Sequence, residues 1–255
     1  MKTKFIFIYS GKGGVGKSTI SINLAYSLAS YNPSLRVGLF DADLEAPSIP
    51  VLLKGLKVAQ PMRMKEMKIL PALIEGVKIS STGLINHPKD NLYLSGKMLE
   101  GALNQLLFHD AWDVDLLLID LPPGTNEIHR QILSRLKGDV LLVTSPQVLS
   151  YSDTQRGIDF LKHFDVNILG IIENLSYHEC HHCGSTNLIF KGNTDKLLAA
   201  PNKLSVIMKL PVMEGLGSRT EDKPFVLSNN NHPISNLFKG LGNMITSNSF
   251  SFVKG

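Results

Sequence analysis

The stretch YSGKGGVGKSTI, residues 9–20, constrains the fold of this chain more than any other feature. It matches the phosphate-binding pattern G-x-x-x-x-G-K-[ST] from Gly11 to Ser18. The run before it, Lys4–Tyr9, is β-branched and aromatic, and apolar residues at helical spacing follow Lys17. A strand, a glycine-rich loop and a helix in this order predict a nucleotide site, because glycines let successive backbone N–H groups and the helix N-terminus face a phosphate.

The pattern assigns tasks to individual residues. We expect Lys17 to reach the β- and γ-phosphates and the Ser18 hydroxyl to bind Mg²⁺. The backbone around the phosphates is formed by Gly11, Lys12, Gly13, Gly14, Val15 and Gly16. A glycine-rich turn that binds nothing is the alternative, and it gives no reason for the flanking strand and helix.

Two acidic segments are predicted to join the loop at one edge of a sheet. A buried strand is expected at Arg36–Phe40 and is followed by Asp41 and Asp43. A second apolar strand is expected at Val114–Ile119 and is followed by Asp120 and then Pro-Pro-Gly124. Ligands of open α/β sheets gather at the carboxyl ends of the strands. We therefore expect Asp120 beside Mg²⁺, Asp41 or Asp43 holding Mg²⁺ through water or orienting an attacking water, and the Gly124 N–H facing the γ-phosphate. Each aspartate, taken singly, could instead cap a turn.

Two features of the sequence predict which base the nucleotide carries: a guanine-binding carboxylate is missing, and an asparagine that could bind adenine is present. Asn202-Lys-Leu-Ser205 resembles the guanine motif Asn-Lys-x-Asp but lacks the carboxylate that would accept from guanine. Asn174, at the end of a predicted strand, has an amide that can donate and accept at the edge of adenine. The sequence thus favours adenine, although Asn174 alone could also be a turn residue.

The two cysteines of the chain, Cys180 and Cys183, form a CxxC pair followed by Gly184. Soft thiolates select zinc or an iron–sulfur cluster, and both kinds of centre usually have four ligands. Histidines such as His178, His181 or His182 could complete the set, or a second chain could supply the rest. A redox pair and two unligated thiols are the remaining interpretations.

Strands alternating with helices predict an α/β fold with a doubly wound, mostly parallel sheet and helices on both faces. We expect one domain over residues 1–245, with a metal-binding segment at 178–184 and a flexible tail at 246–255. Further elements are expected as strands at 77–81, 92–94, 139–144 and 166–172, and as helices at 97–108 and 152–163.

Composition narrows the class of protein. The hydrophobic content of 43% suits a large two-sided core, and the diffuse net charge of +4 does not by itself imply nucleic acid. Residues 54–68 are basic and rich in methionine, which indicates a solvated face or a docking surface. No run approaches a signal-peptide core or a membrane span, so we expect a cytoplasmic protein. An apolar helical stripe at 234–245 is expected to pack on the body.

The loop variant with a second lysine, Lys12, resembles the deviant Walker A loop of the ParA/MinD superfamily, in which that lysine crosses a dimer interface to the partner's nucleotide. Further segments narrow the resemblance to the Mrp/ApbC group of iron–sulfur cluster carrier ATPases: DADLEAPSIP from Asp41, DLPPGT from Asp120, VTSPQ from Val143, ENLS from Glu173 and CxxCG from Cys180.

This resemblance implies a homodimer that binds and slowly hydrolyses ATP, carries a [4Fe–4S] cluster bridged by both CxxC pairs, and passes it to acceptor apoproteins. Neither stable nucleic-acid binding nor membrane binding is implied. By the same resemblance, Lys12, Lys17, Ser18 and Thr19 contact phosphates and metal, and Asp43 orients water. Asp120 then supports Mg²⁺, Asn174 contacts adenine, and Cys180 and Cys183 hold the cluster.

Three departures affect the segments that respond to nucleotide. Ala46 stands where the group usually has glycine, Asn126 and Glu127 replace a Gly-Asp pair, and SGK at 95–97 replaces Arg-Gly-Pro. These changes bear on the hydrolysis rate more than on nucleotide binding. Two other classes remain open: a positioning ATPase acting on DNA or membrane, which leaves the CxxC without a role, and a zinc-stapled dimeric scaffold.

Overall fold

The computed structural model describes residues 3–65, 68–85, 96–108, 112–180, 182–217 and 223–247. The strands of its main sheet are β1 (Lys4–Tyr9), β2 (Val37–Asp41), β3 (Val58–Gln60), β6 (Ala72–Ile74), β7 (Val77–Ser80), β8 (Leu116–Asp120), β9 (Gly138–Thr144), β10 (Val166–Glu173) and β13 (Val206–Lys209). Two hairpins stand apart from that sheet: β4 (Arg63–Lys65) with β5 (Lys68–Leu70), and β11 (His178–Glu179) with β12 (Thr186–Asn187).

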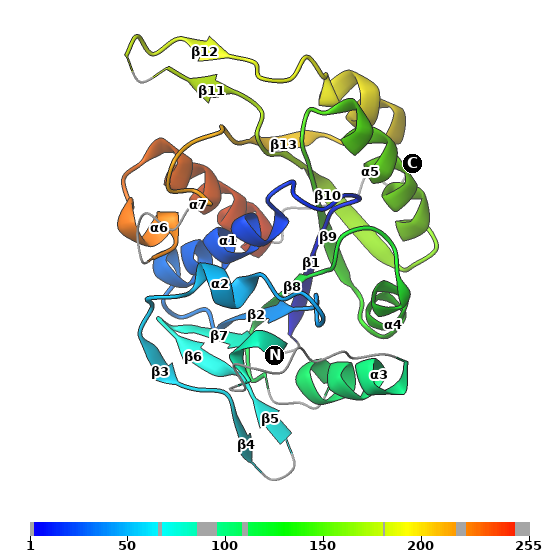
Figure 1. Ribbon diagram of the computed structural model, residues 1–255, viewed down its shortest axis with the longest axis vertical. Helices are drawn as coiled ribbons and strands as arrows, with labels where there is room; N and C mark the ends of the chain where they lie inside the picture. Colours follow the sequence, from blue (N-terminus) through cyan, green and yellow to red (C-terminus); the bar gives the residue numbers. More distant parts are fainter. Residues whose placement is uncertain are drawn as a thin grey trace.

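The main sheet has nine strands in the order β13-β10-β9-β1-β8-β2-β7-β6-β3 (Figure 1). Every pairing from β13 to β7 is parallel, whereas β6 pairs antiparallel with both β7 and β3 at one edge. The predicted doubly wound, mostly parallel sheet is therefore confirmed. Its parallel strands bring the ends of β1, β2, β8 and β10 to one edge of the sheet.

Helices cover both faces of the sheet. They are α1 (Lys17–Tyr31), α2 (Ile49–Leu52), α3 (Lys97–Leu103), α4 (Glu127–Arg135), α5 (Val148–Leu161), α6 (Phe225–Ser228) and α7 (Pro233–Thr246). In Figure 1, α1, α2, α6 and α7 lie on one side of the sheet, and α3, α4 and α5 lie on the other.

The central strand β1 shows why both faces are covered. Ile6 and Ile8 belong to the apolar core under α1 and α7, whereas Phe7 and Tyr9 belong to the core under α4 and α5. Side chains of a strand alternate between faces, so an uninterrupted apolar run needs apolar partners on both sides. Asp120 is the last residue of the buried strand β8, so it lies at the carboxyl end of the parallel strands.

The apolar stripe at 234–245, now in α7, packs against the rest of the protein, as expected. Ile234, Phe238, Leu241 and Ile245 of α7 are buried in the core that contains α1, and Leu237 remains 41% exposed. In the described part of the chain, no helix is both long enough and apolar enough to cross a bilayer.

Several element boundaries differ from the sequence expectation. The segment expected as one helix at 97–108 is α-helical up to Leu103 and π-helical over Asn104–Phe108. The helix expected at 152–163 is α5, which begins earlier, at Val148, and ends at Leu161. The strand expected at 92–94 lies outside the described residues, as does the expected tail from residue 248 onward; Thr246 still belongs to α7. The basic segment contains β3 and β4, whose residues are exposed.

Candidate functional site

The loop between β1 and α1 has the backbone that its glycines predict. Gly14 and Gly16 have φ angles of 81° and 85°, which side-chain-bearing residues rarely adopt. A Cβ on Gly16 would lie 2.2 Å from the Asn174 amide nitrogen, and one on Gly11 would lie 2.3 Å from the backbone of Asp153. Only glycine fits at positions 11 and 16, because the loop packs closely against Asp153 on one side and Asn174 on the other.

Asp120 is the point on which the phosphate-loop residues converge. Its carboxylate is fully buried and accepts hydrogen bonds from Lys17 Nζ at 2.8 Å, Ser18 Oγ at 2.6 Å and Ser21 Oγ at 2.7 Å. The structure therefore brings Lys17, Ser18 and Asp120 together, as predicted. Sequence reasoning missed Ser21; its position one helical turn after Lys17 was the available signal.

The two aspartates after β2 have different surroundings. Asp41 is 1% exposed and accepts hydrogen bonds from the Ser81 hydroxyl and from the backbone N–H groups of Asp43 and Ile49. Burial, and then the nearby Asp120 carboxylate, raise the pKa of Asp41 to about 7. These contacts make Asp41 an internal support for the segment that carries Asp43.

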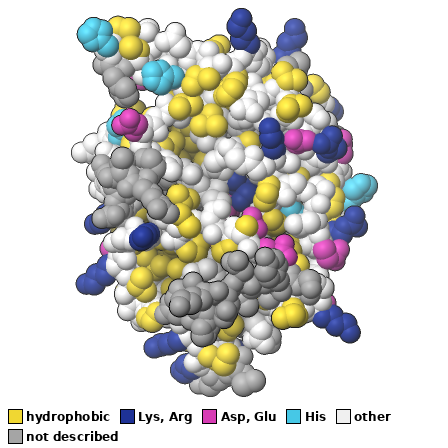
Figure 2. Space-filling model, in the orientation of Figure 1, with side chains coloured by type: hydrophobic (Ala, Val, Ile, Leu, Met, Phe, Trp, Pro, Cys, Tyr) yellow, Lys and Arg dark blue, Asp and Glu magenta, His cyan; other side chains and the backbone are white. Residues whose placement is uncertain are grey.

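Asp43 is half-buried and lines a cavity of about 560 Å³ together with the phosphate loop, Ala46–Ser48 and Pro123. Burial is the main cause that raises the pKa of its carboxyl. In Figure 2, basic and acidic side chains meet near the middle of the face, where β1 passes into α1. The cavity has the size of a ligand pocket, and it is bordered by Lys17, Ser18 and Asp43.

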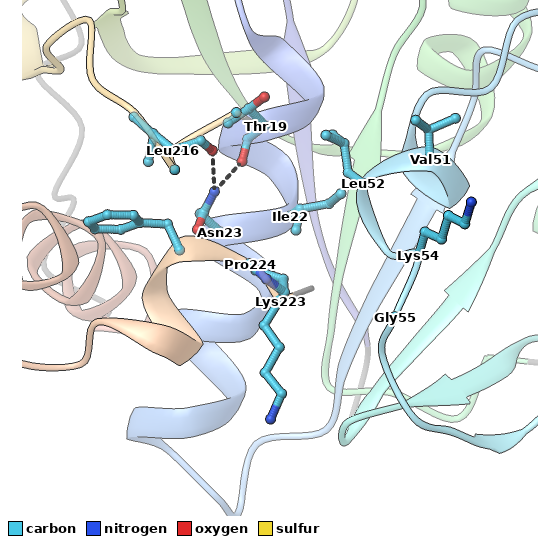
Figure 3. Close-up of a pocket in the computed structure, with 13 residues that line it drawn as sticks. Thr19, Ile22, Asn23, Val51, Leu52, Lys54, Gly55, Leu216, Lys223 and Pro224 are labelled. Atoms are coloured by element: carbon cyan, nitrogen blue, oxygen red, sulfur yellow. Dashed lines mark hydrogen bonds between the residues drawn. The ribbon is translucent and has the colours of Figure 1, made fainter. Parts of the chain in front are cut away.

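A second cavity of about 340 Å³ adjoins the first over α1 (Figure 3). Thr19, Val51 and Leu52 border both cavities. Asn23, 2% exposed, donates from Nδ2 to the carbonyls of Thr19 at 2.9 Å and Leu216 at 3.5 Å, and its Oδ1 accepts from the Val226 N–H at 3.1 Å. Asn23 therefore ties the segment around Leu216 and the start of α6 to the helix that carries Lys17.

Asn174 lies under the phosphate loop. It is 4% exposed, and its Nδ2 donates to the Val15 carbonyl at 2.8 Å. Its Oδ1 has no hydrogen-bond partner among the described residues. This contact makes Asn174 a support of the loop, and its role toward adenine stays a prediction.

Gly124 and His129, which both follow Asp120 in the chain, were not placed correctly from the sequence: the contact of Gly124 differs from the prediction, and His129 was not predicted as a site residue. The Gly124 N–H was expected to face a γ-phosphate, but it donates to the Ser10 carbonyl at 3.0 Å. His129, which is fully buried, donates from Nε2 to the Pro122 carbonyl at 3.0 Å, and its Nδ1 accepts from the Asn126 N–H at 3.2 Å. His129 thus fastens the segment after Asp120 to α4, where Asn126 is the N-cap.

The cysteine pair forms the turn of the β11–β12 hairpin, which extends from the body at the top of Figure 1. The turn is closed by backbone bonds from Cys180 N to Ser185 O and from Gly184 N to Cys180 O, at 2.9 and 2.8 Å. Cys180 is half-buried and Cys183 is exposed. Among the described residues, which omit His181, no third His, Cys, Asp or Glu joins the pair in a metal-sized cluster.

Cys183 has a hydrogen-bonding neighbour of its own. Its sulfur lies 3.1 Å from the Ser185 hydroxyl. Hydrogen bonds from that hydroxyl, and then from the Ser185 N–H and Cys180, lower the pKa of the Cys183 thiol. A thiolate is the form that binds a metal, so the turn suits a soft metal ion or cluster.

Comparison with known proteins gives a consistent result. The family model ParA, described as NUBPL iron-transfer P-loop NTPase, matches residues 2–246. An iron-sulfur cluster carrier protein of Helicobacter pylori is 35% identical over 92% of this chain and 64% of its own length. One of Pseudomonas fragi is 31% identical over 92% of this chain and 83% of its own length.

Among solved structures, a nucleotide-binding protein of Archaeoglobus fulgidus in complex with ADP has 29% identity and a TM-score of 0.65. The match covers 92% of this chain and 86% of that one. The chain thus spans most of the length of the P. fragi and A. fulgidus proteins, but less than two thirds of the H. pylori relative.

Proposed function

We propose, since this chain belongs to the ParA family of P-loop NTPases in its NUBPL iron-transfer form, that it is an ATP-dependent carrier of an iron–sulfur cluster. Specifically, it binds and slowly hydrolyses ATP, holds a [4Fe–4S] cluster as cargo between two copies of the chain, and passes the cluster to acceptor apoproteins.

The observation that carries this proposal is the pairing of two sites in one chain. The phosphate loop converges on Asp120, and Cys180 follows Asn174, which supports that loop, by six residues. A positioning ATPase gives the cysteine turn no task. Cluster carriage uses both sites, and the names of the H. pylori and P. fragi relatives support it.

The nucleotide chemistry is assigned to residues around the larger cavity. Lys17 and the loop N–H groups bind the phosphates, and Ser18 and Asp120 hold Mg²⁺. Asp43 orients the attacking water, since it borders the cavity and Asp41 does not. Lys12, half-buried in the loop, is assigned to the nucleotide of the partner copy.

The cargo chemistry requires a second chain. Each chain contributes two thiols, and a [4Fe–4S] cluster held by cysteines alone needs four. A two-fold axis that passes near the hairpin turn brings Cys180 and Cys183 of both copies together. We assign the protein to the cytoplasm, with acceptor iron–sulfur apoproteins as partners and with no stable binding to nucleic acid or membrane.

Anaerobic reconstitution followed by iron, sulfide and zinc assays tests the function. We expect a broad visible absorption that is lost in air, and no cluster in Cys180→Ala or Cys183→Ala while both variants still bind ATP. Zinc retained tightly in place of iron would support a scaffold instead and contradict the proposal.

A further inference from the structure

A third cavity, of about 410 Å³, lies beside the cysteine turn, and Cys180 forms part of its wall. Tyr177, Glu179 and Gly184 of the hairpin line one side. Pro211–Met213, after β13, and His232–Ile234, at the start of α7, line the other. In Figure 2, hydrophobic side chains gather on this face over β13 and the segment that follows it. Cys183 does not line the cavity, so the two thiols differ in what can approach them.

Backbone hydrogen bonds hold the walls of this cavity in place. The Val212 N–H donates to the Tyr177 carbonyl at 2.7 Å, and the Ser176 N–H donates to the Leu210 carbonyl at 2.8 Å. The cysteine turn is closed by its own two backbone bonds. The cavity is therefore already formed in the single chain, which lowers the cost of admitting a group.

His232 presents a hydrogen-bond donor at the wall that belongs to α7. Its Nδ1 accepts from the Ile234 N–H at 3.2 Å as the N-cap of the helix, so the neutral ring carries its proton on Nε2. The ring packs edge-on against Phe225, with centroids 5.0 Å apart, which fixes its orientation. The N-terminal end of the 14-residue α7 adds a partial positive charge at the same wall.

These features suit a sulfur ligand that carries negative charge. Apolar walls from Val212, Met213 and Pro233 accommodate the methylene group of a cysteine side chain, and His232 Nε2–H can donate to its sulfur. Glu179 is the acidic residue in the lining, and it is exposed to solvent, which screens its charge.

We propose that this cavity admits the cysteine side chain of an acceptor apoprotein, so that transfer of the cluster begins at Cys180, with His232 as a positioning residue. This inference rests on the proposed carrier function. In the exchange, a bond forms between the acceptor sulfur and a cluster iron as the bond between that iron and Cys180 breaks. The proton lost by the acceptor thiol passes to the Cys180 sulfur, and no oxidation state changes.

The first test blocks the cavity with Met213→Trp and uses glutathione as a thiol of known structure. Loss of the cluster from the anaerobically loaded protein is followed by visible absorption. We expect the rate to fall at least about fivefold, because exchange depends on access to the attacked ligand. Met64→Trp, at a 70% exposed position on β4, is the matched control and should exchange like the wild type.

The same variants have a readout that needs no cluster. In the apoprotein, alkylation by iodoacetamide at each cysteine is followed by peptide mass spectrometry. Met213→Trp should slow alkylation of Cys180 and leave that of Cys183 unchanged. Equal alkylation and exchange rates in Met213→Trp and wild type would overturn the cavity as the route. Failure of the wild type to load a cluster would instead contradict the carrier function.

Two substitutions separate the role of His232 as a hydrogen-bond donor from its role as the N-cap of α7. His232→Asn keeps a side-chain acceptor for the Ile234 N–H but removes the imidazole Nε2–H, whereas His232→Ala removes both. We expect both variants to slow exchange with glutathione by about tenfold, the effect of one hydrogen bond to a charged group. His232→Ala should lower the melting temperature more than His232→Asn, because it also removes the helix cap. Wild-type exchange in His232→Asn would remove the positioning role.

Discussion

In the nucleotide site, the buried Asp120 carboxylate is paired with three hydrogen-bond donors. It accepts hydrogen bonds from the side chains of Lys17, Ser18 and Ser21 and is not exposed to solvent. An uncompensated carboxylate at such a position costs several kcal/mol, so the three donors stabilise the fold as well as the site. The same Lys17 and Ser18 atoms are those assigned to phosphate and Mg²⁺, and binding must redistribute these contacts.

Lys17→Ala should abolish useful binding of Mg-ATP. We expect the dissociation constant measured by calorimetry to rise at least about a hundredfold, because two charge-assisted contacts to phosphates are lost. Lys162→Ala, in an exposed pair with Asp159, is the control and should bind normally. Unchanged ATP affinity in Lys17→Ala would contradict the role of Lys17 at the phosphates, and equal affinity of the wild type for Mg-GTP would contradict selectivity for adenine.

Asp43→Asn should separate hydrolysis from binding. The amide cannot orient and activate water as the carboxylate does, so steady-state turnover should fall by about a hundredfold, with ATP affinity nearly unchanged. A turnover rate that survives the substitution would assign the task to another group.

At the scale of elements, the segment between β8 and α4 links the nucleotide edge to a buried histidine. Burial is the main cause that lowers the pKa of His129 from 6.5 to about 4, and the Lys17 charge acts in the same direction. His129 lies edge-on to Tyr9 and Phe160, which keeps water from the ring. The folded protein therefore holds this histidine neutral where the unfolded chain protonates it.

This difference predicts a loss of stability on acidification. Because the unfolded state binds the additional proton between pH 6.5 and about 4, the stabilisation is complete above pH 6.5 and falls as the pH drops through that window. The contribution amounts to about 3 kcal/mol in the free energy of unfolding. Urea titrations of the wild type and His129→Gln across this range should give curves that converge at low pH, and parallel curves would contradict the assignment.

The sequence predicted the elements whose physical cause is local. Apolar runs predicted β1, β8 and β9, and the glycine pattern predicted the loop before Lys17, because each depends on neighbouring residues alone. The Gly124 N–H bond to Ser10, the support of Val15 by Asn174 and the buried state of Asp41 depend on segments far apart in the chain. No spacing rule contains those contacts, so the sequence could place these residues near the site without giving their partners.

At the scale of the whole molecule, the central claim is that two chains share one cluster. The cysteine turn, with Cys180 half-buried and Cys183 exposed, lies on a hairpin outside the main sheet, and the described residues of one chain form no cluster with a third ligand there. On the proposed function, cluster loading and dimerisation rise together, with the cluster near the two-fold axis.

The most direct measurement is native mass spectrometry of the anaerobically loaded protein, with iron and sulfide assayed on the same sample. We predict a dimer that carries one [4Fe–4S] cluster, hence about two irons per chain, and the loss of that species in Cys180→Ala. A monomer that holds one zinc ion, or one complete cluster within a single chain, would contradict the account.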